Sequence, residues 1–332
     1  MAPLVFFGLD GRYSVVLLEA LVQAKLAPRL VVVGREPSAY GRTLSPRLTR
    51  AQPPWWLRAI GLGSLPATPN SNPIDLKARA LALDIDVLEC SDPGVLGARA
   101  RIRGAEPRAF VVAGFHRLLP ATVLALAELG GLNVHPGRLP QERGPAPLFW
   151  RLKDGHTQAY VTVHVVERGE DDGAVVSEAE FEIVPGMSGR EVLERAATAA
   201  APQLVDAIAA LLDRRLAQTP QRPETHGRCP RPNQEDCRVN PNRRALEVFT
   251  YVAACADNYP LFVECGGDRF FIQGAVSYDE EATMAFEYLL TGDRLILRCE
   301  PGVVELALKP GGALFTAEYT DEPAAEPAPQ QG

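Results

Sequence analysis

An asparagine and a histidine, Asn133 and His135, stand two residues apart at the end of the apolar segment GLNVH, residues 131–135. On a β-strand, residues i and i+2 point to the same face, so both side chains would meet the same space. The amide NH₂ can donate to a carbonyl oxygen that gains negative charge, and the imidazole can move a proton near neutral pH. The pair therefore indicates carbonyl chemistry. The structural alternative is a turn held by asparagine hydrogen bonds.

A histidine used in this way needs an orienting partner, and the segment RGEDDGAVV, residues 168–176, offers carboxylates. Asp171, Asp172 and Gly173 form a predicted tight turn at the end of an apolar, alternating segment;. Spacing alone does not choose between Asp171 and Asp172.

Alternating strands and helices must position these side chains. Two apolar runs, residues 3–9 and 28–34, carry a glycine at or next to their last position and flank a segment of helical spacing, residues 14–25. This order predicts a parallel βαβ unit with a ligand site at the carboxyl ends of the strands. Similar patterns predict strands at 86–90, 108–115, 131–135 and 158–166, the last antiparallel or at an edge, and helices at 74–85, 120–130 and 188–216;. The fold class is therefore α/β, with an open, mainly parallel, Rossmann-like sheet.

Composition divides the chain into four parts. Residues 1–216 carry the alternating pattern, although residues 35–74 are irregular, and residues 217–243 are rich in proline and polar residues, which predicts a linker;. A helix at 243–256 and short apolar runs with turn signals predict a small, OB-like β-barrel domain over 244–316;. The Pro/Ala/acidic tail, residues 317–332, is predicted to be disordered;.

The overall composition excludes several classes of protein. The 332 residues carry a net charge of −7 and contain six cysteines without a C-x-x-C pair. No secretory signal or apolar run of about 20 residues is present, so we expect a cytoplasmic protein with reduced thiols and no membrane association. His226, Cys229 and Cys237 lack a fourth ligand at zinc spacing, so no metal is expected;. The first strand is not followed by G-x-G-x-x-G, which argues against a nicotinamide-binding domain;.

Three motifs, in this order and spacing, resemble the folate-dependent formyltransferases. NVHPGRLPQERGPAP is similar to the family's N-x-H, small-Ser-Leu-Leu-Pro and R-G-x-x-P signature, and the family's Asp-x-Gly, about 36 residues after the histidine, falls on Asp171. VVAGFHRLLP, residues 111–120, resembles the segment that lines the pterin pocket. The join to the C-terminal domain is similar to that of the members that formylate methionyl-tRNA.

The resemblance implies transfer of a formyl group from 10-formyltetrahydrofolate to a primary amine, without a metal or a nicotinamide. It implies that Asn133 and His135 stabilise the oxyanion, that His135 can also move the amine proton, and that Asp171 orients His135 and a water. It further implies a folate site formed by Arg117, Leu118, Leu119, Gly137, Arg138, Leu139, Pro140, Val166 and Glu167, with the backbone of 166–170. The chain departs from the family pattern at Gly137 and Arg138, where serine and leucine are usual.

The implied acceptor is methionyl-tRNA, and two arginine-rich segments agree with it. Residues 29–58 contain six arginines against one glutamate, and residues 214–244 contain eight arginines against three acidic residues. Basic patches can hold phosphates, and an aromatic pair can stack on a base. The expected tRNA contacts are Arg42, Arg47, Arg50, Trp55 and Trp56.

Two alternatives stay open at this point. One is a formyltransferase that acts on a nucleotide-linked amino sugar or another small amine, because arginine-rich loops are often merely solvated and the whole chain is acidic. The other is a non-catalytic RNA-binding protein. A monomer is expected in either case.

Overall fold

The computed structural model describes residues 2–35, 75–222 and 227–310. The predicted tRNA contacts Arg42, Arg47, Arg50, Trp55 and Trp56, together with the tail at 317–332, lie outside the described residues.

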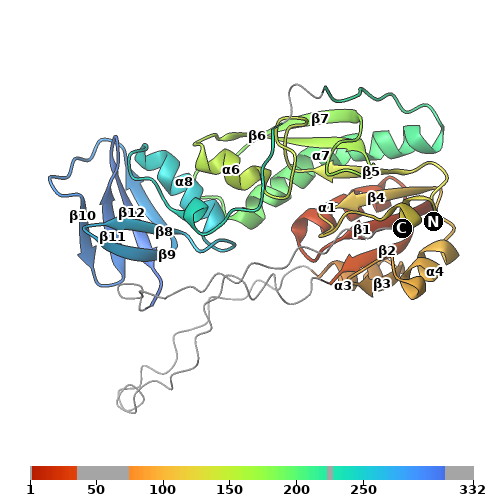
Figure 1. Ribbon diagram of the computed structural model, residues 1–332, viewed down its shortest axis with the longest axis horizontal. Coiled ribbons are helices and arrows are strands. Elements are labelled where there is room, and N and C mark those ends of the chain that lie inside the picture. The colour runs from red at the N-terminus through yellow and green to blue at the C-terminus, as the bar shows by residue number, and fades with distance from the viewer. Residues whose placement is uncertain (1, 36–74, 223–226, 311–332) are drawn as a thin grey trace, which may run out of the picture.

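The first domain is a layered α/β structure around a seven-stranded sheet (Figure 1). Its elements, in chain order, are β1 (Ala2–Gly8), α1 (Arg12–Gln23), β2 (Pro28–Gly34), α3 (Leu76–Ala82), β3 (Asp86–Cys90), α4 (Leu96–Gly104), β4 (Ala109–Ala113), α5 (Ala121–Leu124), β5 (Gly131–His135), α6 (Pro147–Lys153), β6 (Gln158–Val165), β7 (Val175–Glu182) and α7 (Gly189–Leu212).

The strand order is β3-β2-β1-β4-β5-β6-β7, and the first five strands in this order are parallel. β6 is antiparallel to both β5 and β7. The mainly parallel, Rossmann-like sheet predicted from the sequence is therefore confirmed, as is the antiparallel direction of β6. The carboxyl end of β5 lies where the sheet changes from parallel to antiparallel pairing.

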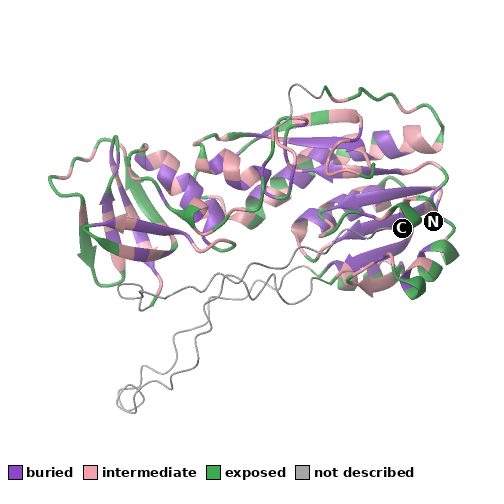
Figure 2. Cartoon of the chain, in the orientation of Figure 1, coloured by how far each residue is buried: buried purple, intermediate pink, exposed green. Residues whose placement is uncertain are grey.

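The parallel strands other than the edge strand β3 are buried on both faces (Figure 2). Phe6 and Val111 contribute to one apolar cluster with α1, α3 and α7, while Phe7 and Phe110 contribute to the opposite cluster with α4 and α5. Val134 belongs to the first cluster. Because side chains alternate along a strand, Asn133 and His135 face the side on which α4 and α5 lie.

Some of the helices differ from the prediction. α4 and α6 were not expected, and the predicted helix over 120–130 is only the short α5. The segment 188–216 forms the single helix α7, which continues through Pro202. Ser188 caps it: its Oγ accepts from the Glu191 amide, while the Glu191 carboxylate accepts from the Ser188 amide, which is a capping box;.

The C-terminal domain is an open antiparallel sheet of five strands, a half-barrel with strand order β10-β11-β12-β9-β8. It is preceded by a 3₁₀ turn and a helix, and its elements are η2 (Glu235–Cys237), α8 (Ala245–Cys255), β8 (Phe262–Cys265), β9 (Asp268–Asp279), β10 (Tyr288–Thr291), β11 (Arg294–Arg298) and β12 (Val303–Leu308). The small β-domain predicted from the turn signals is confirmed in this form.

The two sheets share one continuous apolar core through α6 and α8. Phe149 on α6 is only 2% exposed, and its ring lies 5.7 Å from that of Tyr251 on α8 and 4.6 Å from that of Tyr259. The half-barrel is therefore packed against the first domain. None of the helices within the described ranges has the length and apolar character needed to cross a membrane.

Replacement of Phe149 by alanine should lower the free energy of unfolding by about 3–5 kcal/mol, because it leaves a cavity in the shared core. Urea denaturation of the full chain measures this. Phe286→Ala is the matched control, since Phe286 lies in the C-terminal domain and is 71% exposed. A loss below about 1 kcal/mol for Phe149→Ala would show that the two domains do not share a core.

Candidate active site

The register of β5 against β6 brings four polar side chains together. Asn133 lies opposite His164, and His135 lies opposite Thr162. His135, His164 and Thr162 are all buried. The N-terminus of α1 supports this end of the sheet, because the Tyr13 hydroxyl donates to the Val134 carbonyl at 2.9 Å.

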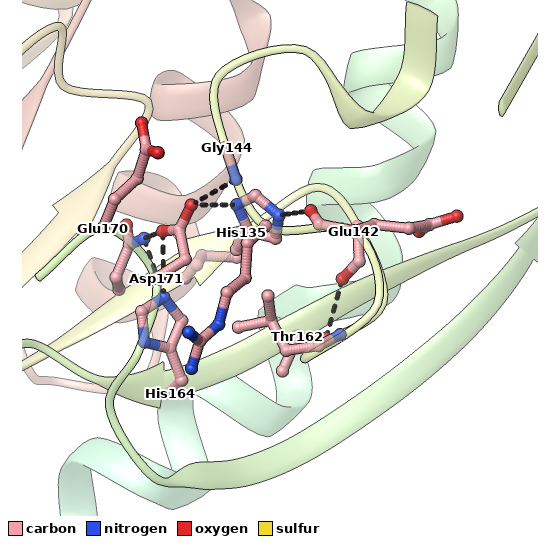
Figure 3. A network of polar contacts seen from close by, with 12 residues as sticks. His135, Glu142, Gly144, Thr162, His164, Glu170 and Asp171 are labelled. Atoms are coloured by element: carbon pink, nitrogen blue, oxygen red, sulfur yellow. Dashed lines mark hydrogen bonds and ion pairs between the residues drawn. The ribbon is translucent and has the colours of Figure 1, made fainter. Parts of the chain in front are cut away.

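The structure places Asp171, and not Asp172, beside these residues (Figure 3). One carboxylate oxygen of Asp171, Oδ2, accepts from the Gly144 amide at 3.0 Å and lies 3.4 Å from His135 Nδ1. The other, Oδ1, accepts from Asn133 Nδ2 at 3.3 Å and lies 3.5 Å from His164 Nε2. The side chain is 13% exposed. The backbone is left-handed, with φ of 50°, a conformation that aspartate tolerates better than most residues;.

The Asp171 carboxyl group is held in its ionised form. Burial would raise its pKa, but the electrostatic interactions with the rings of His135 and His164 and the hydrogen bond from the Gly144 amide outweigh burial and lower the pKa to about 2. Asp171 therefore carries a full negative charge at neutral pH.

His135 is neutral and its proton position is determined by its partners. Its Nε2 lies 2.7 Å from the Glu142 carbonyl oxygen, and a carbonyl can only accept, so Nε2 carries the proton;. Burial lowers the pKa of His135, against the raising effect of the Asp171 charge and the Glu142 carbonyl. The lone pair of Nδ1 then faces Asp171. A proton taken up at Nδ1 would create an imidazolium paired with that carboxylate.

His164 orients the amide of Asn133. His164 Nδ1 donates to the Val165 carbonyl at 2.9 Å, so its Nε2 is an acceptor and receives Asn133 Nδ2 at 3.0 Å. The ionised Asp171 also requires a donor, which directs the NH₂ and not the carbonyl of Asn133 toward it;.

One N–H of Asn133 stays available for a substrate. The distances among Asn133 Nδ2, His164 Nε2 and Asp171 Oδ1 are 3.0, 3.3 and 3.5 Å, so the two acceptors lie about 70° apart as seen from the nitrogen;. The two N–H bonds of an amide diverge by about 120°. A single N–H directed between the two acceptors can serve both, which leaves the second N–H for a substrate oxygen.

The loop after His135 requires glycine at position 137. A Cβ atom there would lie 2.7 Å from Pro147 Cβ and 2.9 Å from His135 Nε2, so a side chain would displace the imidazole. Thr162 Oγ1 donates to the Gly137 carbonyl at 2.7 Å and accepts from the Leu139 amide at 3.3 Å. The departure from the family serine thus accompanies close packing around His135.

Arg138, the second departure from the family pattern, lies against β6 and β7. Its guanidinium is 3.2 Å from the Glu178 carboxylate and 4.4 Å from the centre of the Tyr160 ring. Arg151 stacks on the same ring and pairs with Glu142, whose carboxylate also accepts from the Arg138 amide at 2.6 Å. These contacts hold the loop that presents the Glu142 carbonyl to His135.

The remaining predicted folate residues lie in three segments. Leu119 and Val166 pack in the apolar cluster on the Asn133 side of the sheet. Leu118, which precedes Leu119, is 57% exposed. Arg117 pairs with Asp92 at 3.2 Å, and Glu167 is exposed. Leu139 and Pro140 belong to the loop after His135, and Leu139 is buried.

Three contributors were missed from the sequence: His164, Thr162 and the Glu142 carbonyl. A polar residue at every second position of the strand YVTVHVV was the available signal, but only the register with β5 reveals its partner.

As for metals, the described residues contain no cluster of three or more His, Cys, Asp or Glu arranged to hold one. His226 lies outside the described residues. Burial raises the pKa of both Cys229 and Cys237 to about 11.

Comparisons with known proteins point to one family. Residues 97–208, which include β4 to β7 and most of α7, match the Formyl transferase family. A methionyl-tRNA formyltransferase of Koribacter versatilis is 30% identical over 53% of this chain and 57% of its own length. One from Solibacter usitatus is 29% identical over 75% of this chain and 71% of its own. This chain spans about half to three fifths of the length of three of the curated relatives that it matches.

Solved structures of formyltransferases share the fold over nearly the whole chain. The N-formyltransferase from Helicobacter canadensis, in complex with folinic acid and dTDP-3-aminofucose, has a TM-score of 0.61 at 13% identity and covers 93% of this chain and 99% of its own. A methionyl-tRNA formyltransferase from Clostridium thermocellum has a TM-score of 0.51 at 13% identity over 92% and 99%. At these identities the likeness establishes the fold. The segment that carries Asn133, His135 and Asp171 lies within residues 97–208, the part of the chain that matches the Formyl transferase family.

Proposed function

We propose that this chain transfers a formyl group from 10-formyltetrahydrofolate to a primary amine. The observation that carries the proposal is the buried arrangement of Asn133, neutral His135 and ionised Asp171 at the carboxyl end of β5. It supplies an N–H donor for an oxygen that gains charge and a base whose protonated form is paired with a carboxylate. Both are what acyl transfer to an amine requires.

Each residue has a separate part in the proposed reaction. A bond forms between the formyl carbon and the amine nitrogen, and the bond between that carbon and the folate nitrogen breaks. Asn133 donates its second N–H to the formyl oxygen while that oxygen carries negative charge. His135 accepts at Nδ1 the proton that the attacking amine loses, and Asp171 stabilises the resulting imidazolium. The same proton can then move to the leaving nitrogen.

The folate is proposed to bind on the Asn133 side of the sheet. Buried Leu119 and half-buried Val166 offer an apolar wall on that side, and exposed Leu118 extends it. Leu139 and Pro140 follow His135 in the loop and would close the other side of the site. An apolar wall beside a few oriented donors is the usual composition of a site for a ring ligand.

Methionyl-tRNA is the acceptor that we propose first, on the basis of the curated relatives. The predicted tRNA contacts Arg42, Arg47 and Arg50 lie outside the described residues. A tRNA acceptor would require this or another cationic surface to hold phosphates.

A small amine, such as a nucleotide-linked amino sugar, is the second candidate, and the charge distribution favours it. Residues 245–310 contain four Lys and Arg against eleven Asp and Glu, so the half-barrel repels a polyanion;. Six of the eight arginines between 214 and 244 are paired with carboxylates in the structure, namely Arg214, Arg215, Arg228, Arg238, Arg243 and Arg244. The second arginine-rich segment is therefore largely neutralised.

The His135→Asn variant should lower kcat/KM for formyl transfer by about 10²–10⁴-fold, because it removes the base. The assay follows formylation of the accepted amine with 10-formyltetrahydrofolate as donor. His156→Asn, at an exposed histidine before β6, is the matched control and should keep full activity. Undiminished activity of His135→Asn would remove His135 from the reaction.

The pH dependence of kcat/KM should show one acid limb with its midpoint below pH 6.5. Neutral His135 is the reactive form and burial lowers its pKa, so activity is lost only as the pH falls through that lowered value. In Asp171→Asn the midpoint should fall further, because the charge that raises the His135 pKa is gone. Asp268→Asn, at an exposed aspartate of β9, should keep the wild-type profile. An acid limb above pH 6.5 would contradict the assignment.

The two acceptor classes differ in their response to salt. Methionyl-tRNA and a dTDP-linked amino sugar should be compared in parallel at low and high salt, with kcat and KM measured for each. If methionyl-tRNA is the acceptor, its KM should rise steeply with salt, since each phosphate contact releases a counterion. Efficient formylation of the sugar alone, with little salt dependence, would replace the first candidate by the second.

A further inference from the structure

The first part of the segment between the two domains is hydrogen-bonded to the first domain. Thr219 pairs with Val175 of β7 through two backbone hydrogen bonds of 2.8 and 2.7 Å. Further along, the Cys229 amide donates to the Arg143 carbonyl at 2.6 Å, and the Ala146 amide donates to the Cys229 carbonyl at 3.2 Å. The interdomain segment therefore lies along the loop that follows His135.

Gln221 of this segment makes four hydrogen bonds with its side-chain amide. Its Oε1 accepts from Arg143 Nε at 3.0 Å and from Arg143 Nη2 at 2.9 Å. Its Nε2 donates to the Asp171 carbonyl at 2.8 Å and to the Gly173 carbonyl at 2.6 Å. An amide has two donors and two lone pairs, so the full capacity of this side chain is used.

These four bonds connect the two segments that meet where the Gly144 amide donates to the Asp171 carboxylate. Asp171 is a left-handed residue, and Gln221 ties its carbonyl to that of Gly173 across the same turn. Arg143 directly precedes Gly144, whose amide donates to the Asp171 carboxylate. Gly144 packs closely against the interdomain segment, because a Cβ on it would lie 2.7 Å from the Cys229 carbonyl oxygen. One side chain thus connects the Asp171 turn with the loop that binds its carboxylate.

We propose that Gln221 is a positioning residue for formyl transfer: it holds the Asp171 carboxylate in place against His135 and Gly144. The inference rests on the proposed function, since it assigns Gln221 to the same reaction. It makes the segment between the domains part of the active site. A purely structural Gln221 would only attach that segment, and its loss would lower stability without acting through Asp171.

The Gln221→Met variant removes all four hydrogen bonds without adding a charge. We expect kcat to fall by about 10²-fold, the cost of a displacement of about 1 Å in a catalytic group, with KM for the folate changed less than about twofold. Gln273→Met, at an exposed glutamine of β9, is the matched control and should match the wild type in both values. An unchanged kcat in Gln221→Met would overturn the proposal.

A double-mutant comparison separates positioning from attachment. In an Asp171→Asn background, Gln221→Met should lower kcat by less than about threefold further, because residues that act as a unit are not additive. The same 10²-fold loss in both backgrounds would overturn the proposal. Gln221→Glu serves if Gln221→Met does not fold: it keeps acceptors for Arg143 but lacks the two donors, and it should lose kcat similarly.

A measurement that does not depend on activity keeps the two proposals apart. NMR titration of the His135 ring in the full chain reports how closely Asp171, Glu142 and His164, the titratable groups around it, act on the imidazole. The His135 pKa should be lower in Gln221→Met than in the wild type and the Gln273→Met control, as the Asp171 charge moves away. An unchanged pKa would overturn the positioning role. A wild-type chain that formylates no amine would overturn the proposed function alone.

Discussion

The negative charge of Asp171 is the constraint on which the proposed active site depends. A carboxylate that is 13% exposed and ionised must be stabilised by its surroundings, and four groups face it: the Gly144 amide and Asn133 as donors, and the rings of His135 and His164. Each of these groups is thereby oriented. The charge directs the NH₂ of Asn133 inward, stabilises a proton on His135 Nδ1 and holds the loop after His135 through Gly144. Loss of this one charge would release all four.

The fold meets this constraint by joining segments that are distant in sequence. β5 contributes Asn133 and His135, the antiparallel strand β6 contributes His164 opposite Asn133, and the turn between β6 and β7 contributes Asp171. Because β6 is antiparallel to β5, the end of β6 lies beside Leu132 near the start of β5, and the turn that follows brings the Asp171 carboxylate to Asn133 and His135. The interdomain segment then covers the turn, with Gln221 hydrogen-bonded to both sides.

Local patterns in the sequence predict the framework but only part of the site. The period of two in GLNVH places Asn133 and His135 on one face, and the structure agrees. Local pattern left Asp171 and Asp172 equivalent, because the choice depends on which carboxylate the left-handed turn directs inward. His164 and Gln221 could not be found in this way, since their partners are fixed by strand register and by a contact across 50 residues. The packing of α6 on α8, and hence the shared core around Phe149, is likewise a long-range result.

A crystal structure of the full chain with 5-formyltetrahydrofolate, a stable relative of the proposed donor, tests the proposed site most directly. We expect the pterin ring to lie against Leu119 and Val166. The position of the transferred formyl group should lie within hydrogen-bond distance of Asn133 Nδ2 and within about 4 Å of the His135 ring. Binding of the folate away from β5, or with its reactive nitrogen remote from Asn133 and His135, would contradict the proposed site.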